Sequence, residues 1–265
     1  MFDKSKKELS RKAFIFLIVF IILSSATYFI KLNTYSFRRP FCIKGIIYCP
    51  EQNLLTLIRG VCYNTFYNFT FQSNFLVLLF CIGTLNSKFR NSKNYSLWAF
   101  CILVNILLTG VVWNLIADPF VDYKNFKYEF LTVSLCEHTY IPILFTIFYF
   151  SNFYVNPPFT SCRKNYLALI HPLFYLFYSL ILGSIKNQYF YRYPYNFMNP
   201  FSSCNISLII NNLFDLNFYN NSSQGWFGVL INNVFLLLVL LIVIPILFRI
   251  KKILVNKTFL PSKKK

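Results

Sequence analysis

Long apolar runs, separated by short polar segments, cover most of this chain. The runs are about 18 to 22 residues long, which is the length that a helix needs to cross the hydrocarbon core of a bilayer. The pattern predicts six transmembrane helices, at residues 13–30, 67–85, 96–117, 131–150, 166–185 and 227–248. No internal repeat or soluble domain interrupts the pattern. We therefore expect an all-α, polytopic fold with one six-helix transmembrane domain over residues 1–265.

Two of these runs are less regular than the others. The run at 13–30 follows a short basic stretch, as in a signal peptide, but it is long and lacks a small-residue cleavage site, so we expect an uncleaved span. The run at 67–85 opens with polar residues, which lower its hydropathy: Asn68, Thr70, Gln72, Ser73 and Asn74. Leaving this run out would reverse the predicted orientation of every later span.

The composition and the charge distribution agree with a membrane protein. The chain is 56% hydrophobic and 13% charged, and its net charge is +18. With both termini in the cytoplasm, 17 Lys and Arg residues lie in the inner segments and 9 in the outer ones. Basic residues favour the cytoplasmic side of a membrane. The charge therefore indicates cell-membrane topology, basic cytoplasmic tails at 1–12 and 249–265, and attraction to anionic lipids, rather than nucleic-acid binding.

Two long outer loops, residues 32–66 and 186–226, carry most of the remaining polar sequence. Their cysteines could form disulfides in an oxidising exterior, although the sequence does not give the pairing. These are Cys42, Cys49, Cys62 and Cys204. The cysteine spacing has no C-x-x-C zinc signature, and the chain has two histidines. No nucleotide, flavin or haem motif is present, so we expect neither a metal nor a cofactor.

Two polar residues inside predicted spans are the candidates for chemistry. Thr70 lies a few residues after the start of the second span, and His138 lies a few residues after the start of the fourth. Both spans run inward, so both residues are expected about 5 to 10 Å below the outer hydrocarbon boundary. Polar and ionisable residues at such positions are expensive and often functional. A hydroxyl and an imidazole that meet there could act as nucleophile and base.

The surrounding residues extend this hypothesis to acyl transfer. Thr70, Ser73, Asn74 and Val77 share one face of a helix, which would be polar at its outer end and apolar further in. Gln72, Ser73 or Asn74 could donate to an oxyanion. On the fourth span, Pro142 frees the backbone carbonyl of His138. Such a site would accept a membrane lipid or a fatty-acyl ester.

Other interpretations of these residues remain open. A threonine in a membrane helix commonly bonds back to its own helix, and a histidine can hold two helices together. His171 is expected at the inner interface, far from the candidate site. Asparagines within the spans are expected to make helix–helix contacts: Asn105, Asn114, Asn232 and Asn233. The chain would then be a small-solute transporter or a non-catalytic membrane scaffold.

Several sequence blocks resemble a known family. They are Phe-Thr-Phe-Gln-Ser-Asn-Phe-Leu-Val at 69–77, Glu-His-Thr-Tyr-Ile-Pro-Ile-Leu-Phe at 137–145, and the segment 171–183 followed by Tyr-Pro-Tyr-Asn-Phe at 193–197. Their order and spacing, over about residues 60–250, resemble a bacterial six-span membrane family. That family is distantly similar to the androgen-induced membrane hydrolases, which include the androgen-dependent TFPI-regulating protein.

This resemblance implies an activity and two site residues. The androgen-induced hydrolases are multi-pass threonine hydrolases that cleave fatty-acid esters of hydroxy fatty acids. By the resemblance, Thr70 matches their nucleophile and His138 their base. The sequence thus favours an intramembrane Thr/His hydrolase or acyltransferase that acts on fatty-acyl lipid esters at the outer leaflet.

Overall fold

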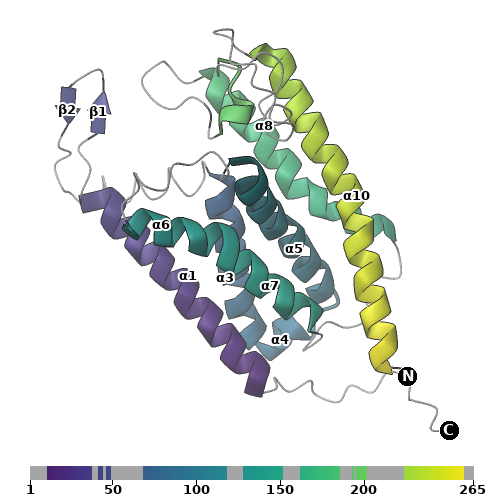
Figure 1. Cartoon of the computed structure of the whole chain (residues 1–265). Coiled ribbons are helices and arrows are strands. Elements are labelled where there is room, and N and C mark those ends of the chain that lie inside the picture. Colours follow the sequence, from purple (N-terminus) through teal and green to yellow (C-terminus); the bar gives the residue numbers. More distant parts are fainter. Residues whose placement is uncertain are drawn as a thin grey trace.

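The fold is a bundle of long helices, seen in a computed structural model that describes residues 11–37, 41–43, 46–48, 68–117, 128–151, 162–185, 193, 195–201 and 224–259 (Figure 1). The α-helices are α1 (Arg11–Phe37), α3 (Phe69–Leu85), α4 (Ser87–Arg90), α5 (Tyr95–Val111), α6 (Tyr128–Leu135), α7 (Ile141–Phe150), α8 (Ile170–Ile185) and α10 (Gly225–Phe259). Four other helical segments are the π-helical η1 (Val112–Ala117) and η4 (Cys136–Tyr140) and the 3-10 helical η5 (Cys162–Leu169) and η6 (Asn196–Met198). Two strands, β1 (Phe41–Ile43) and β2 (Ile46–Tyr48), pair antiparallel, with Phe41 opposite Tyr48.

Five stretches of helix are long and apolar enough to cross a membrane in the part of the chain that is described. They are Ala13–Ile30, Tyr95–Asn114, Thr132–Phe150, Lys164–Ser184 and Gly225–Leu254. Five of the six spans that the sequence predicts lie at nearly these positions. The chain is thus rich in membrane-type helices, as expected of a multi-pass membrane protein.

The sixth predicted span corresponds to α3, which is apolar but has 17 residues. At 1.5 Å per residue this helix is about 25 Å long, against about 30 Å for the hydrocarbon core. The helix is shorter than the predicted span 67–85 because Asn68 is extended, with φ −103° and ψ 125°, and ends the helix on its N-terminal side. The count of six spans therefore stays a prediction.

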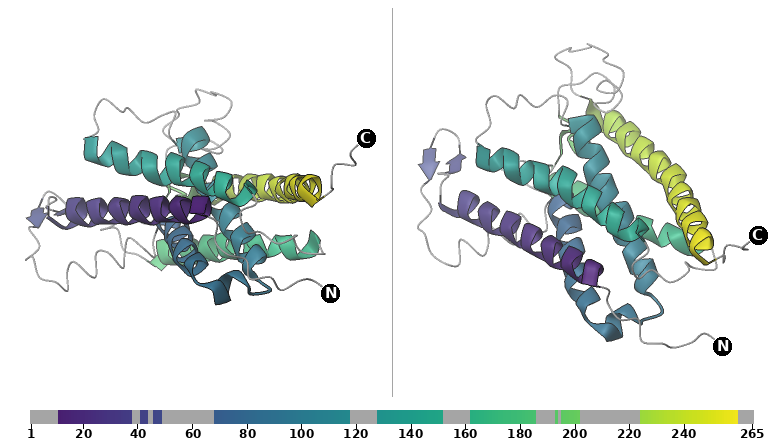
Figure 2. Two further views of the ribbon diagram at one scale, coloured as in Figure 1. Left: turned by 90° about the horizontal axis from the view of Figure 1, so that it is seen from below. Right: turned by 60° about the horizontal axis from the view of Figure 1, so that its bottom comes forward.

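The core lies where α1, α3, α5 and α7 pack together. α5 contacts α3, α7 and η5, while α1 contacts α3 and α7. Figure 1 and the two turned views in Figure 2 show α8 and α10 on the other side of α5 from α1. Large side chains fill the interior, including Phe20, Phe100, Leu103, Phe145 and Tyr149. Burial of such side chains stabilises the bundle, because it excludes lipid and water and forms dense van der Waals contacts.

Two buried cationic side chains cap the C-termini of helices at one end of the bundle. Arg90 Nη1 donates to the carbonyl oxygens of Thr84 (2.6 Å) and Leu85 (2.8 Å), at the C-terminus of α3. Lys251 Nζ donates to the Tyr149 carbonyl oxygen (2.7 Å), at the C-terminus of α7. Both cations satisfy carbonyls that a helix end leaves without a partner, where the helix dipole favours positive charge.

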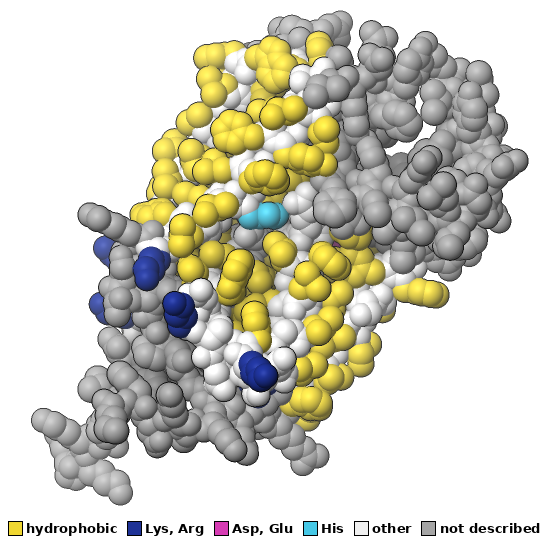
Figure 3. All heavy atoms as spheres, turned by 180° about the vertical axis from the view of Figure 1, so that it is seen from behind, with side chains coloured by type: hydrophobic (Ala, Val, Ile, Leu, Met, Phe, Trp, Pro, Cys, Tyr) yellow, Lys and Arg dark blue, Asp and Glu magenta, His cyan; other side chains and the backbone are white. Residues whose placement is uncertain are grey.

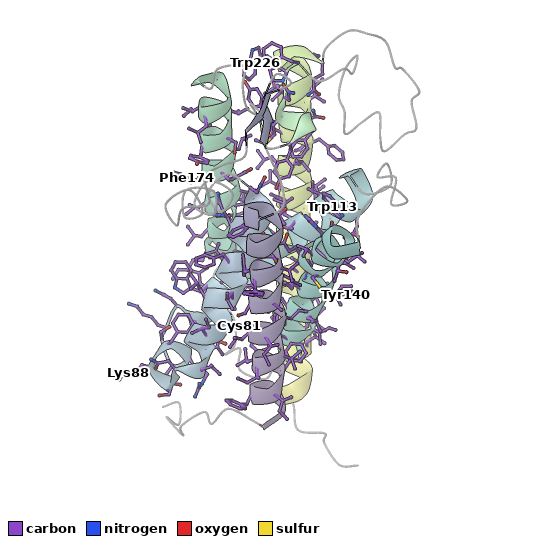
Figure 4. All side chains as sticks on the ribbon, turned by 90° about the vertical axis from the view of Figure 1, so that its left-hand side faces the viewer. Cys81, Lys88, Trp113, Tyr140, Phe174 and Trp226 are labelled. Carbon is purple, nitrogen blue, oxygen red and sulfur yellow. The ribbon has the colours of Figure 1, made fainter. Side chains whose placement is uncertain are left out.

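The outer surface of the bundle is mainly apolar. Figure 3 shows hydrophobic side chains over most of the described part of one face, with the visible Lys and Arg side chains gathered toward one end. In Figure 4, Lys88 marks that end and Trp226 the opposite end. An apolar face with its visible basic side chains toward one end is compatible with a lipid environment.

The cysteine side chains that the structure describes all lie within helices. Cys81 and Cys136 are buried free thiols and Cys101 is a half-buried one, as expected of packing residues inside the helices. Cys49, Cys62 and Cys204 lie outside the described residues, and the side chain of Cys42 is likewise not described.

Candidate functional site

Thr70 and His138, the two residues that the sequence singled out, touch each other. Thr70 is the second residue of α3, and His138 lies in the middle of the π-helical segment η4. The Thr70 hydroxyl oxygen is 3.2 Å from His138 Nε2. The two residues are 9% and 8% exposed, so this contact is shielded. The prediction that the two side chains can meet is therefore correct as geometry.

The His138 ring is held from its other nitrogen. Nδ1 lies 2.8 Å from the Ser134 carbonyl oxygen and 3.4 Å from the Ser134 hydroxyl. A carbonyl oxygen can only accept, so in the neutral ring the hydrogen is on Nδ1 and the Nε2 lone pair faces Thr70. The Thr70 hydroxyl therefore donates to His138. This is the direction of transfer that a base for this hydroxyl requires.

One face of the His138 imidazole is covered by Trp113. The two ring centroids are 4.0 Å apart and the planes are inclined by 15°. Trp113 belongs to the other π-helical segment, η1. Along the bundle it lies between Trp226 and Lys88 (Figure 4). Stacking on one face and hydrogen bonds at both nitrogens leave the ring little freedom to rotate.

The backbone around His138 explains why η4 is not ordinary α-helix. Pro142 has no N–H for the carbonyl of His138, four residues earlier. The Asn114 side chain supplies a donor instead, with Nδ2 2.9 Å from the His138 carbonyl oxygen. The Asn114 Oδ1 in turn accepts from the Thr139 hydroxyl (3.0 Å). The two π-helical segments η1 and η4 thus face each other and fix His138 from its backbone; such segments are frequent at functional sites.

A close approach of two helices supports the same geometry. A Cβ added at Gly110 in α5 would lie 3.1 Å from the His138 carbonyl oxygen and 3.1 Å from Pro142 Cβ. Contacts this short force the neighbour to move. Glycine at this position therefore lets α5 pack directly against the backbone that carries His138.

Tyr195 is a third residue at the contact, and the sequence-based selection missed it. Its hydroxyl oxygen is 3.2 Å from the Thr70 hydroxyl and 3.2 Å from the Thr70 backbone nitrogen. The first backbone N–H groups of a helix have no partner within that helix, and the Asn68 side chain does not cap α3. Tyr195 thus serves as the acceptor for the first turn of α3 from a segment 125 residues away in the chain.

The segment that carries Tyr195 is fastened to the start of α10. Asn232 donates to the Phe197 carbonyl oxygen (2.8 Å), and Gln224 donates to the Asn199 carbonyl oxygen (2.6 Å). The Tyr195 ring stacks on Phe197, with centroids 5.3 Å apart. Burial is the main reason that the pKa of the Tyr195 phenol is raised, and it outweighs the effect of the hydrogen bonds between Tyr195 and Thr70. The phenol is therefore neutral, with a hydrogen to donate, at physiological pH.

The three residues predicted as oxyanion donors point elsewhere. Ser73 Oγ and Asn74 Nδ2 both donate to the Thr70 backbone carbonyl oxygen, at 3.0 and 2.8 Å. Asn74 Nδ2 is also 3.2 Å from the Glu137 carbonyl oxygen. Both side chains hold the backbone of Thr70; Asn74 also joins α3 to η4, while Ser73 contacts the Thr109 hydroxyl of α5 (2.7 Å). Gln72 Oε1 is 2.9 Å from His171 Nε2.

His171 corrects a sequence-based interpretation. We expected it at the inner interface, far from the candidate site, but it lies among α3, α5 and α8. Its Nδ1 is 2.8 Å from Asn105 Oδ1, and its ring is 5.1 Å from that of Phe69. The expectation was wrong because His171 lies well inside the helix Lys164–Ser184, and because its amide partners on α3 and α5 come from distant parts of the chain. The expected helix–helix contacts of Asn105 and Asn114 are present.

Two residues of the site had weak signals in the sequence. Tyr195 stands in the block Tyr-Pro-Tyr-Asn-Phe at 193–197, which contributes to the family resemblance but contains no candidate site residue. Trp113 is one of several aromatic residues in an apolar run. Aromatic residues make up 21% of the chain, so neither spacing nor hydropathy marks a particular one as a site residue.

Comparisons with models of known protein families, with curated proteins and with solved structures give no match for this chain. A proposal for function therefore rests on the geometry of Thr70, His138 and Tyr195. Within the described parts of the chain, no group of three or more His, Cys, Asp or Glu side chains could hold a metal ion. The site consists of a hydroxyl, an imidazole and a phenol.

Proposed function

We propose that this chain is a multi-pass membrane ester hydrolase, with Thr70 as the nucleophile and His138 as its general base. The observation that carries the proposal is the oriented hydrogen bond from the Thr70 hydroxyl to His138 Nε2, 3.2 Å long and shielded from solvent. A threonine hydroxyl becomes a useful nucleophile only when such a base accepts its proton. The Ser134 carbonyl takes the role of the third group that orients the base.

The reaction that fits this pair is acyl transfer in two stages. The Thr70 oxygen attacks the ester carbonyl carbon, its proton passes to His138 Nε2, and the carbonyl electron pair moves to oxygen. When the carbonyl reforms, the bond to the leaving alcohol breaks and His138 returns the proton to that alcohol. Water, deprotonated by His138, then releases the acid and restores Thr70. An acceptor alcohol in place of water would give acyl exchange by the same steps.

Fatty-acyl esters are the substrate class that we favour. The pair lies close to the start of α3, among helices whose outer faces are apolar, so an ester within a lipid could approach from the membrane (Figure 3). Residues 69–77 and 137–145 resemble a bacterial six-span family that is distantly similar to the membrane threonine hydrolases, and this resemblance points to the same class and to the same two residues.

The proposal includes an orientation. We propose that α3 is the sixth span and that both termini are cytoplasmic in the cell membrane, which puts the site toward the outer leaflet. Arg90 and Lys251, which cap the C-termini of α3 and α7, support this orientation together with Lys88, Lys93, Arg249 and Lys252. Basic residues are retained on the cytoplasmic side.

A fluorophosphonate probe tests the nucleophile directly. We expect the purified, detergent-solubilised protein to be labelled at Thr70, as mapped by mass spectrometry of the modified peptide. Thr70→Ala removes the reacting oxygen and His138→Ala removes the base, so both variants should lose labelling. Thr70→Ser should keep it, because the hydroxyl remains.

Thr84 offers a matched control on the same helix. It is also a buried threonine, but its hydroxyl donates to the Phe80 carbonyl oxygen and contacts the Tyr95 hydroxyl. Thr84→Ala should be labelled as fast as the unaltered protein. Equal labelling of folded Thr70→Ala and the unaltered protein would refute the nucleophile and favour the scaffold interpretation of these residues.

A further inference from the structure

We propose that Tyr195 is a further catalytic residue of this site, and that its hydroxyl donates the hydrogen bond that stabilises the oxyanion formed when Thr70 attacks an ester. This inference rests on the proposed function. The segment between α8 and α10 would then supply the oxyanion donor. Neither the motifs on the second and fourth spans nor the predicted donors on α3 supply this donor.

The direction of each hydrogen bond follows from its partners. The Thr70 backbone N–H can only donate, so the Tyr195 oxygen accepts it (3.2 Å). The Thr70 hydroxyl hydrogen points to His138 Nε2, as the Ser134 carbonyl dictates. The Thr70 oxygen is therefore left as the acceptor for the hydrogen of Tyr195, at 3.2 Å. The result is a chain of hydrogen bonds from Tyr195 through Thr70 to His138.

The hydrogen bond that Tyr195 donates can change its acceptor during the attack. Once the Thr70 oxygen bonds to the ester carbon, it is a poorer acceptor, while the former carbonyl oxygen becomes negative two bonds away. A hydroxyl that contacted the attacking oxygen needs only to rotate about its own C–O bond to reach the new charge. A donor of this kind, ready before the charge forms, contributes about 100- to 1000-fold to the rate.

The other donors near Thr70 are engaged differently. Ser73 and Asn74 donate to the Thr70 carbonyl oxygen, which lies on the helix and not at the hydroxyl. Gln72 is turned toward His171. Tyr195 is the side chain for which contacts with both the hydroxyl and the backbone nitrogen of Thr70 are observed.

The anchoring of Tyr195 suits this role. Asn232 is buried in α10 and donates both to the Phe197 carbonyl oxygen (2.8 Å) and to Gln224 Oε1 (3.0 Å). Met198 packs with Phe69 and Tyr175, and its backbone nitrogen donates to the Tyr195 carbonyl oxygen (3.0 Å). A preorganised donor must be held in place by its surroundings, and these contacts hold the backbone on the C-terminal side of Tyr195.

The first test replaces the hydroxyl and follows hydrolysis of p-nitrophenyl laurate. Tyr195→Phe should lower kcat about 100-fold and leave KM within about three-fold, because the interaction forms mainly in the transition state. Tyr193→Phe is the matched control, since it removes a phenol two residues away whose ring packs on Trp226. It should keep kcat within about two-fold of the unaltered protein.

A second variant separates donation from the capping of α3. Tyr195 is replaced by 3,5-difluorotyrosine, which keeps the ring and the hydroxyl but loses its proton at lower pH. Its phenolate accepts the Thr70 N–H even better but cannot donate, so kcat should fall as the phenolate forms. Burial raises the pKa of this phenol, so its ionisation is followed by ultraviolet absorbance over the same pH series as kcat. The unaltered protein, and the protein with the same replacement at Tyr193, should show no such fall.

The outcomes distinguish the inference from the proposed function. If Tyr195→Phe folds and keeps full kcat while Thr70→Ala and His138→Ala are inactive, Tyr195 is only a cap of α3. If Tyr195→Phe does not fold, a kcat that stays constant while the difluorophenol at position 195 ionises overturns the inference, and a kcat that falls with this ionisation supports it. If Thr70→Ala retains hydrolysis and labelling, the proposed function fails first, and the role of Tyr195 fails with it.

Discussion

The two histidines of the chain occupy opposite sides of the same helix turn, and they meet different chemistry there. Thr70 and Gln72 are two positions apart on α3, so their side chains leave the helix about 200° apart. On one side the Thr70 hydroxyl contacts His138 Nε2 at 3.2 Å. On the other side Gln72 Oε1 contacts His171 Nε2 at 2.9 Å. Both rings are held at both nitrogens by groups from the bundle.

The two histidines differ in whether the group that faces the ring can transfer a proton to it. His138 faces a hydroxyl, which can pass a proton to the ring and become a nucleophile. His171 faces two amide oxygens, of Gln72 and Asn105, which can only accept. A neutral ring satisfies that arrangement if one of the two amides is turned to present its nitrogen. Residue type and position within a long apolar helix do not separate the two histidines; the group that faces each ring does.

The strongest way to break this comparison is to remove each ring in turn. His138→Gln should lower kcat for p-nitrophenyl laurate about 1000-fold, because the general base is lost. His171→Gln should change kcat by less than about three-fold, since a glutamine can still hydrogen-bond to its neighbours. Steady-state hydrolysis and a thermal melt in detergent, measured on both variants, separate lost chemistry from lost folding.

Two results would reverse the assignment. A loss of activity in folded His171→Gln as large as that in His138→Gln would make the Gln72–His171–Asn105 cluster part of the reaction. Full activity of His138→Gln would remove the base from the proposed mechanism.

A smaller effect is expected when the backbone of His138 is displaced. Gly110→Ala places a Cβ 3.1 Å from the His138 carbonyl oxygen, so η4 must shift by a few tenths of an ångström. We expect kcat to fall about ten-fold, because reaction rates are sensitive to small misplacements of catalytic groups. Single-turnover labelling by the fluorophosphonate probe measures the loss at the chemical step.

Gly83→Ala is the control for this substitution. A Cβ at Gly83 would lie 3.2 Å from atoms of the Phe89 ring, a side chain that can move, at the other end of α3. The labelling rate should stay within about two-fold of the unaltered protein. Equal losses in the two glycine variants would mean that general destabilisation, and not the position of His138, causes the effect.

These residues also show how far the sequence carries the structure. Hydropathy predicted the apolar helices, and membrane depth paired Thr70 with His138, because both depend on patterns local to the chain. The role of Pro142 was also local: a proline frees the carbonyl four residues earlier, and Asn114 occupies it. What failed depends on contacts between distant segments. Tyr195 reaches Thr70 across 125 residues, and His171 reaches Gln72 across 99.

The contacts of the oxyanion candidates differ from the expected ones for a related reason. Ser73 and Asn74 share a helix face with Thr70, which predicted that they would serve the same substrate. Side chains three and four residues after a threonine can equally reach its carbonyl oxygen, and that is where both of them donate. Spacing along a helix therefore predicts which side chains are neighbours but does not predict which atom of the neighbour they bind.

The smallest expected effect concerns the structural side of the comparison. If Gln72 and His171 serve packing, then Gln72→Ala and His171→Ala should each lower the free energy of unfolding, and the double variant should lose less than the sum. We expect a coupling of about 0.6 kcal/mol, the typical value for hydrogen bonds between membrane helices. Denaturant unfolding in mixed micelles measures it for the four proteins of the cycle. Labelling per folded molecule should be the same in all four. A coupling near zero, with labelling lost in both single variants, would show that the two residues act through the site and not through stability.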